Sequence, residues 1–148
     1  MADDPETEAV AEPETEPSPL RPAFTYPVPD DVIRRLAPAA LRTYRRLVDL
    51  LGLSQFEQRT LLGLAAGEDM PTSEEITEEQ FYRLSYVFGI WMDKSALRGE
   101  EGAIKWFNTP YDSEEMAGRT PVGYMIDQGL PGFDYLRREA AYWAHNGW

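Results

Sequence analysis

Residues 77–92 have the sequence TEEQFYRLSYVFGIWM, which indicates the fold class of the chain. Thr77 and Gln80 form a capping-box pattern, which is typical of the first turn of a helix. The residues that share one helical face after it are Phe81, Leu84, Ser85, Phe88, Trp91 and Met92. A strand over residues 86–91 would suit the β-prone side chains, but Gly89 and the helical spacing count against it. Because apolar residues also lie off the main face, we predict a central helix that is buried on two sides.

On the C-terminal side of this helix, residues that end helices alternate with residues that start them. Gly99 is expected to end the central helix, and a short helical stretch should follow before residues 109–119, whose Pro, Gly and polar residues indicate a loop. Thr120 and Pro121 are a cap and first-turn pair, and Gly129 should stop the helix that they begin. A last helix is expected over residues 133–145, with a buried stripe made of Phe133, Leu136, Ala140 and Trp143.

On the N-terminal side, two short helices are expected before Gly52. Asp30 or Asp31 would cap the first, and Pro38 suits the first turn of the second, which stops at Gly52. The apolar residues that share one face of the second helix are Leu41, Tyr44, Leu47, Val48 and Leu51.

A further helix should follow at once. Ser54 and Glu57 form another capping box, and this helix would run toward Leu64. No set of alternating strands is evident in the sequence, so the predicted fold class is all-α.

The charge of the chain limits its partners. The formal net charge is −12, and residues 1–27 hold seven acidic residues against Arg21 alone. A negative potential of this size argues against whole-molecule attraction to DNA or to anionic lipid. We expect residues 1–27 to form a disordered, acidic, Pro/Glu-rich tail that is either purely solvating or a partner-binding arm.

The residue types present also exclude several kinds of chemistry. There is no cysteine, and His145 is the only histidine, so histidine-based zinc sites and Ser-His-Asp triads lack the residues they need. The N-terminus lacks the features of a signal peptide, and no apolar run approaches the roughly 20 residues of a membrane span. We therefore predict a cytoplasmic protein that is not an enzyme, has no catalytic residues, metal or cofactor, and does not engage a membrane.

Several short motifs resemble a known family. RLSYVFGI at residues 83–90, WFNTP at 106–110, GRTP at 118–121 and HNG at 145–147 occur in the order and at about the spacing seen in antitoxins of the Xre/MbcA/ParS type. The resemblance covers residues 80–148 well and residues 32–64 weakly. It implies a helical, helix-turn-helix-like region over residues 28–76 and a small helical toxin-binding domain over residues 77–148.

The resemblance also implies a function. Members of this family bind RES-domain toxins, which consume NAD, and close off the active site of the toxin. The chain would then be the antitoxin of a type II toxin–antitoxin system, would bind no NAD itself, and could repress its own operon as a complex with the toxin.

Candidate toxin-binding residues lie toward the C-terminus. Arg119 could either tie down the long loop or contact a partner, since its planar guanidinium suits carboxylates and carbonyl groups. The residues on the outer face of the last helix are Tyr135, Arg138, Tyr142 and His145. Tyr and Arg are enriched in interface hot spots, although ordinary exposed residues would give the same pattern. The terminal Asn146, Gly147 and Trp148 could insert an aromatic ring into a partner, or fold back on the core.

DNA binding is the alternative function, that of a transcription regulator without a toxin partner. Arg42, Arg45 and Arg46 could contact the phosphates of operator DNA, although such a stripe is commonly just solvated. Residues 65–71 (AAGEDMP) stand where the family has a basic, Trp-containing recognition segment. We therefore expect weak, salt-sensitive DNA binding by the chain alone.

The central helix also raises the question of self-association. Val87, Ile90 and Trp91 extend its apolar surface beyond what the neighbouring short helices would obviously cover. A second copy could bury them, which predicts a homodimer. Alternatively, helices from both halves of one chain could enclose this segment.

Overall fold

A computed structural model describes residues 27–146, and within this range the regular secondary structure is all helix, without strands. The five helices are α2 (Asp30–Leu51), α3 (Gln55–Leu61), α4 (Glu78–Phe107), α5 (Pro121–Gln128) and α6 (Leu130–Asn146). The all-α class predicted from the sequence is thus confirmed. The predicted tail, residues 1–27, lies almost wholly outside the described residues.

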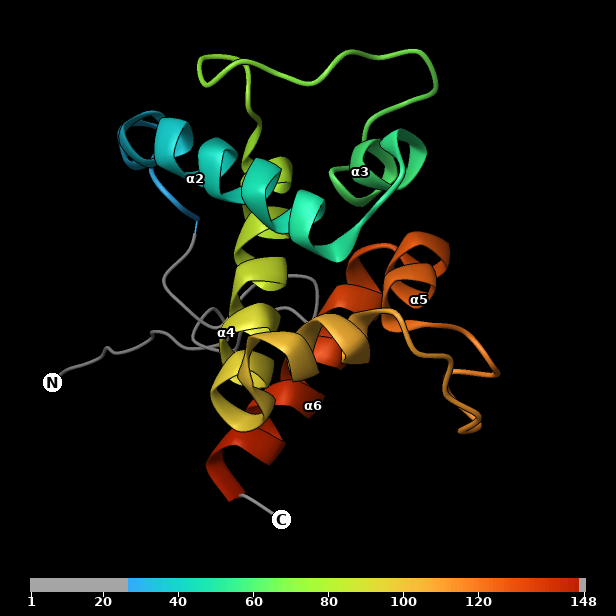
Figure 1. The fold of residues 1–148 in the computed structure, drawn as a ribbon. Coiled ribbons are helices and arrows are strands. Elements are labelled where there is room, and N and C mark those ends of the chain that lie inside the picture. Colours follow the sequence, from blue (N-terminus) through green and yellow to red (C-terminus); the bar gives the residue numbers. More distant parts are fainter. Residues whose placement is uncertain (1–26, 147–148) are drawn as a thin grey trace, which may run out of the picture.

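Helix α4 is the axis around which the other helices pack. α2 crosses its N-terminal half and α6 runs along it, while α5 lies between α6 and α3 (Figure 1). The predicted capping box is present, because Thr77 accepts a hydrogen bond from the backbone of Gln80 and Gln80 accepts one from Thr77. Gly99 has a φ of 79° and interrupts the helical backbone, as predicted, so α4 consists of two helical stretches joined at a kink.

The prediction of two helices before Gly52 was wrong. α2 is continuous through Pro38, and Pro29 precedes it without a side-chain cap, so Asp30 and Asp31 lie in its first turn. Pro38 is exposed, while Ile33, Ala37, Leu41 and Tyr44 form one buried stripe on both sides of it. Burying this stripe outweighs the backbone hydrogen bond that proline cannot make.

The remaining helix ends are set mainly by local caps. The capping box of Ser54 and Glu57 starts α3, Thr120 caps α5, and Gly129 ends it, all as predicted. α6 begins at Leu130, three residues before the predicted start. Its stripe also differs from the prediction, because Trp143 is 37% exposed rather than buried.

One continuous apolar core links the two predicted regions. It extends from Val28 and Ile33 through Leu84 and Ile90 to Phe133 in α6. The described part of the chain therefore shares a single core, and residues near both of its ends depend on one another for burial.

The surface from which we expected a homodimer is covered within one chain. Val87 is buried and Ile90 is 0% exposed, with α2 and α6 packed against α4. Trp91 is half-buried and stacks near Phe107, their ring centroids 6.3 Å apart. The premise that these residues need a second copy was wrong, and the homodimer itself stays a prediction.

Candidate functional site

A groove lies between the C-terminal half of α4, the loop of residues 108–120 and α6. Its volume is about 420 Å³, and we call it the α4–α6 groove. Its lining residues are Lys94, Leu97, Arg98, Trp106, Tyr111, Asp112, Ser113, Met116, Tyr135, Leu136, Glu139 and Trp143. The lining is mainly aromatic and apolar with a few charged groups, which is the usual composition of a binding site.

Lys94 is the buried charged residue of the groove. It is only 2% exposed, and its Nζ lies 3.3 Å from Oε1 of Glu139 and 4.4 Å from the ring centroid of Trp106. Burial lowers the pKa of the Lys94 ammonium group, and the Glu139 carboxylate opposes that shift. The groove therefore has a polar pair beside an aromatic ring, where a bound side chain would find both hydrogen-bonding and apolar surfaces.

Exposed aromatic rings extend the groove along α6. Tyr142 is 58% exposed and packs edge-on against Trp143, with 5.3 Å between the ring centroids. Tyr135 is also partly exposed and packs against Tyr124 of α5 at 5.6 Å. We call Tyr135, Tyr142 and Trp143 the α6 aromatic strip. Their side chains are 37% to 58% exposed, so they leave aromatic surface in contact with solvent along α6.

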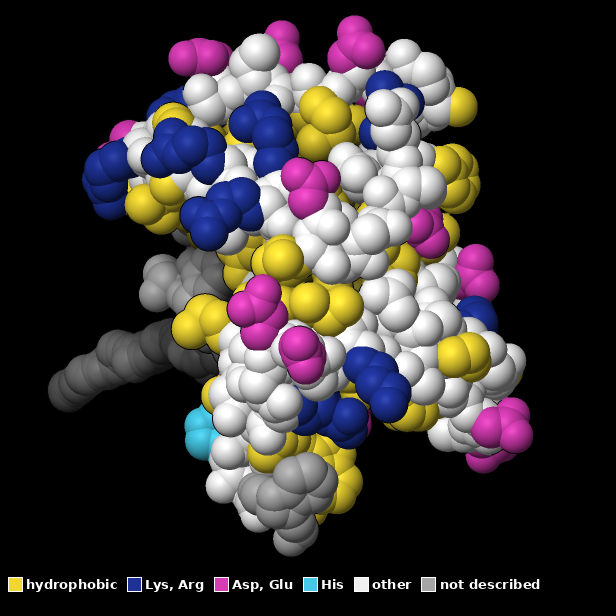
Figure 2. Space-filling model, in the orientation of Figure 1, with side chains coloured by type: hydrophobic (Ala, Val, Ile, Leu, Met, Phe, Trp, Pro, Cys, Tyr) yellow, Lys and Arg dark blue, Asp and Glu magenta, His cyan; other side chains and the backbone are white. Residues whose placement is uncertain are grey.

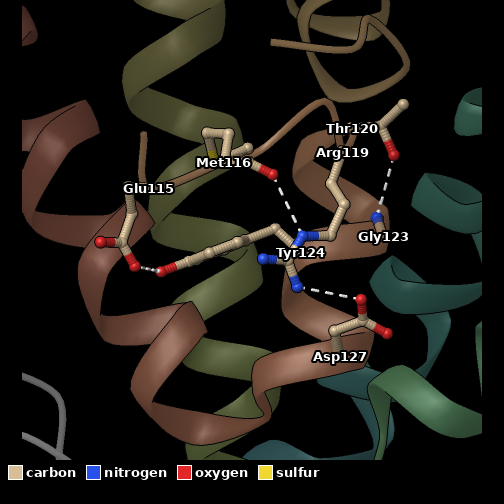
Figure 3. A network of polar contacts seen from close by, with 7 residues as sticks. All are labelled: Glu115, Met116, Arg119, Thr120, Gly123, Tyr124 and Asp127. Atoms are coloured by element: carbon tan, nitrogen blue, oxygen red, sulfur yellow. Dashed lines mark hydrogen bonds and ion pairs between the residues drawn. The ribbon is translucent and has the colours of Figure 1, made fainter. Parts of the chain in front are cut away.

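The loop that bounds the groove is held in place by Arg119. Its Nε donates to the carbonyl oxygen of Met116 at 3.1 Å, and its Nη1 donates to Asp127 at 3.0 Å (Figure 3). Its guanidinium also lies over the ring of Tyr124, whose hydroxyl donates to Glu115. Arg119 thus joins the loop to α5, which is the first of the two roles considered for it.

The other predicted toxin-binding residues have local partners on α6. Arg138 is ion-paired with Asp134, one turn earlier. His145 Nδ1 lies 2.9 Å from the carbonyl oxygen of Ala141, and the Asn146 amide donates to the carbonyl oxygen of Tyr142. Arg138, His145 and Asn146 are all exposed, while Gly147 and Trp148 lie outside the described residues.

Of the described residues that were predicted to bind the toxin, only Tyr135 lines the groove. Most of the other residues that line the groove were not predicted from the sequence. The unpredicted lining residues with aromatic or paired charged side chains are Lys94, Trp106, Tyr111, Glu139 and Trp143. One signal was available in the sequence. Lys94 lies seven residues after Val87 and four after Ile90, so it shares their buried helical face.

The predicted DNA-binding residues lie elsewhere, on α2. Arg42, Arg45 and Arg46 are exposed, and Figure 2 shows basic side chains gathered over this helix at the upper left. Arg34 of the same helix differs, because it donates to the carbonyl oxygens of Ser73 and Ile76 and holds the loop before α4.

Within residues 27–146, the structure contains no cluster of three or more His, Cys, Asp or Glu side chains suited to a metal ion. None of the helices described is long and apolar enough to cross a bilayer. Comparison with known proteins finds no matching family model, no matching curated protein and no matching solved structure.

Proposed function

We propose that this chain is a protein-binding antitoxin that neutralises a RES-domain toxin in the cytoplasm. The observation that carries the binding role is the α6 aromatic strip beside the α4–α6 groove. Tyr and Trp dominate interface hot spots because they bury large, rigid surfaces on binding. A solvent-exposed cluster of them next to a hollow fits a partner surface that inserts a side chain.

The groove suits a side chain that is apolar with a polar end. Trp106 and Trp143 provide aromatic walls, while Lys94 and Glu139 provide a donor and an acceptor. A buried polar pair adds specificity, since a partner that cannot hydrogen-bond to it would leave it unsatisfied.

The class of partner rests on the family resemblance of the motifs. WFNTP and GRTP lie at the two ends of the loop that bounds the groove. Their residues have clear architectural roles here: Trp106 is beneath Lys94, and Thr120 caps α5 by accepting from Gly123. A family motif that shapes this groove supports the groove as the toxin-binding site.

Co-expression with the reading frame beside the gene, with growth and copurification as readouts, tests this function. The wild-type chain should rescue growth and copurify with the toxin, and Tyr142→Ala with Trp143→Ala should lose both. Phe56→Ala is the matched control, because Phe56 is a 68% exposed aromatic residue on α3. Full rescue by a folded double variant would remove the strip from the proposal. Failure of the wild-type chain to bind any RES-domain neighbour would overturn the antitoxin function.

The exposed arginines of α2 favour a second candidate, a DNA-binding regulator. Arg42, Arg45 and Arg46 could contact phosphates, and binding through them should weaken steeply with salt. Fluorescence anisotropy with the gene's own promoter, at low and physiological salt, distinguishes the two. Tight, sequence-specific binding at physiological salt by the chain alone would favour the regulator.

A further inference from the structure

Four arginines on α2 have no ion-pair partner among the described residues. They are Arg35, Arg42, Arg45 and Arg46, and we call them the basic face of α2. Five other arginines pair with a carboxylate, namely Arg34, Arg83, Arg119, Arg137 and Arg138. Arg59 and Arg98 also have no ion-pair partner among the described residues, but they stand singly on α3 and α4.

The geometry of α2 brings these charges together. Residues 35, 42 and 46 lie at i, i+7 and i+11 and point to nearly the same side, and Arg45 is adjacent. Like charges four residues apart on a helix, such as Arg42 and Arg46, repel one another. Asp31 and Asp49 lie on the same helix, but neither forms an ion pair with these arginines among the described residues, so an acidic occupant would be stabilised there.

The same chain contains a segment of complementary charge. Residues 1–26 carry seven carboxylates, all between residues 3 and 16, and a single arginine, Arg21. The segment ends three residues before the N-cap of α2, Pro29, so its local concentration at the helix is of the order of millimolar.

The segment is also long enough to reach the face. From Asp30 to Arg46, α2 rises by about 24 Å at 1.5 Å per residue. The stretch between Glu16 and Pro27 can span up to about 37 Å when extended. All four arginines are therefore within reach of the carboxylates.

We propose that the acidic segment of residues 3–16 binds the basic face of α2 within the same chain. It shields the arginines from other polyanions, so that nucleic acid must displace it before binding to α2. The contact is electrostatic and exposed to solvent, so added salt weakens it. The Debye length at physiological ionic strength is about 8 Å. This inference does not depend on the antitoxin function.

Paramagnetic relaxation by NMR on the full chain tests the contact. The chain has no cysteine, so Ala9→Cys takes a single nitroxide label. At low salt the amide signals of residues 42–46 should lose most of their intensity, while those of residues 139–143 on α6 should not. Replacing Arg42, Arg45 and Arg46 with Gln should restore the α2 signals, whereas the control Arg98→Gln, at another exposed arginine, should not.

Two results would overturn the proposal. One is broadening that is equal on α2 and α6 or that persists in the triple variant. The other is broadening of an isotope-labelled chain without a nitroxide when it is mixed with nitroxide-labelled chain, which would assign the contact to a second copy.

Discussion

At the scale of single residues, Lys94 shows how a buried charged group is stabilised in the groove. Placing an ammonium group in the interior costs several kcal/mol, in rough terms, unless it is paired and hydrogen-bonded. Glu139 supplies the opposite charge and Trp106 a ring face, so the groove holds a buried ammonium group beside an aromatic ring.

We expect Glu139→Gln to destabilise the fold by about 1 to 2 kcal/mol. The change removes the counter-charge of a buried lysine. The expected loss of stability is smaller than for a fully buried ion pair because the Glu139 side chain is 33% exposed. Urea unfolding followed by tryptophan fluorescence measures it. Glu79→Gln is the control, since the Glu79 side chain is 58% exposed and its pair with Arg83 should contribute less than about 1 kcal/mol. Equal losses from both changes would contradict the role of burial.

A second residue-scale prediction concerns Tyr44, whose hydroxyl donates to the carbonyl oxygen of Gln58 at 2.6 Å. Burial raises the pKa of Tyr44 above its ordinary value. Above about pH 10 the unfolded chain loses this proton while the folded chain keeps it, so stability falls with rising pH by up to about 1.4 kcal/mol per unit. Tyr86 and Tyr124 shift in the same direction and add to the fall.

Urea unfolding between pH 8 and pH 11, in wild type and Tyr44→Phe, isolates the contribution of this residue. The phenylalanine variant should lose less stability per pH unit above about 10. The lowered pKa of Lys94 changes stability with pH in the opposite direction. Its contribution is the same in both chains and cancels when their stabilities are subtracted. Parallel curves would show that Tyr44 does not cause the fall.

At the scale of elements, α2 remains helical through a proline, a residue that usually ends or kinks a helix. Pro38 lies inside it and cannot donate to the carbonyl oxygen of Arg34. The buried stripe that includes Ala37 and Leu41 keeps the helix continuous, so the helix keeps an unfavourable residue at an exposed position.

Pro38→Ala should therefore stabilise the protein by about 1 to 3 kcal/mol, because alanine restores the backbone hydrogen bond and has the highest helix propensity. Thermal and urea unfolding measure the gain. Pro110→Ala is the matched control, since Pro110 is an exposed proline in a loop and its replacement has no helix to improve. A loss of stability in Pro38→Ala would mean that proline contributes more by restricting the unfolded chain than it costs the helix.

At the scale of the whole molecule, α6 is part of the core as well as the carrier of the exposed strip. Phe133, Leu136 and Ala140 are buried against the rest of the chain, and α6 is the main packing partner of α4. The proposed binding surface and part of the core therefore share one helix, so a test of toxin binding must also measure folding.

We expect a truncation before Phe133 to abolish folding as well as toxin neutralisation, since it exposes the apolar face of α4. Circular dichroism and the loss of a cooperative unfolding transition would show this. Removing only residues 147 and 148 is the control and should leave the helical fold intact. A truncated chain that still unfolds cooperatively would show that α6 is dispensable for the core.

Oligomeric state is a further whole-molecule property. Ile90→Glu places a carboxylate at a fully buried position and should unfold the chain rather than separate a dimer. Light scattering and circular dichroism on wild type and variant measure both effects. A variant that stays folded while a wild-type dimer dissociates would restore the central helix as an interface.

Local residues determined the helical class and most helix ends. The boxes at Ser54 and Thr77, the cap at Thr120 and the break at Gly99 each act within a few residues, so the sequence alone predicts them. The acidic segment and the arginines of α2 are likewise evident from the residues themselves.

Only the tertiary structure decided where these elements meet. The groove joins Lys94 and Trp106 of α4 with Glu139 of α6, and their pairing depends on how α6 packs along α4. Trp143 is exposed, although it follows the spacing of the buried stripe, because no element within residues 27–146 covers the groove beside it. Pro38 remains in a helix because burial of the apolar stripe of α2 stabilises the helix by more than the one backbone hydrogen bond that proline lacks. Burial and coverage are properties of neighbours brought together by folding, and local periodicity does not specify them.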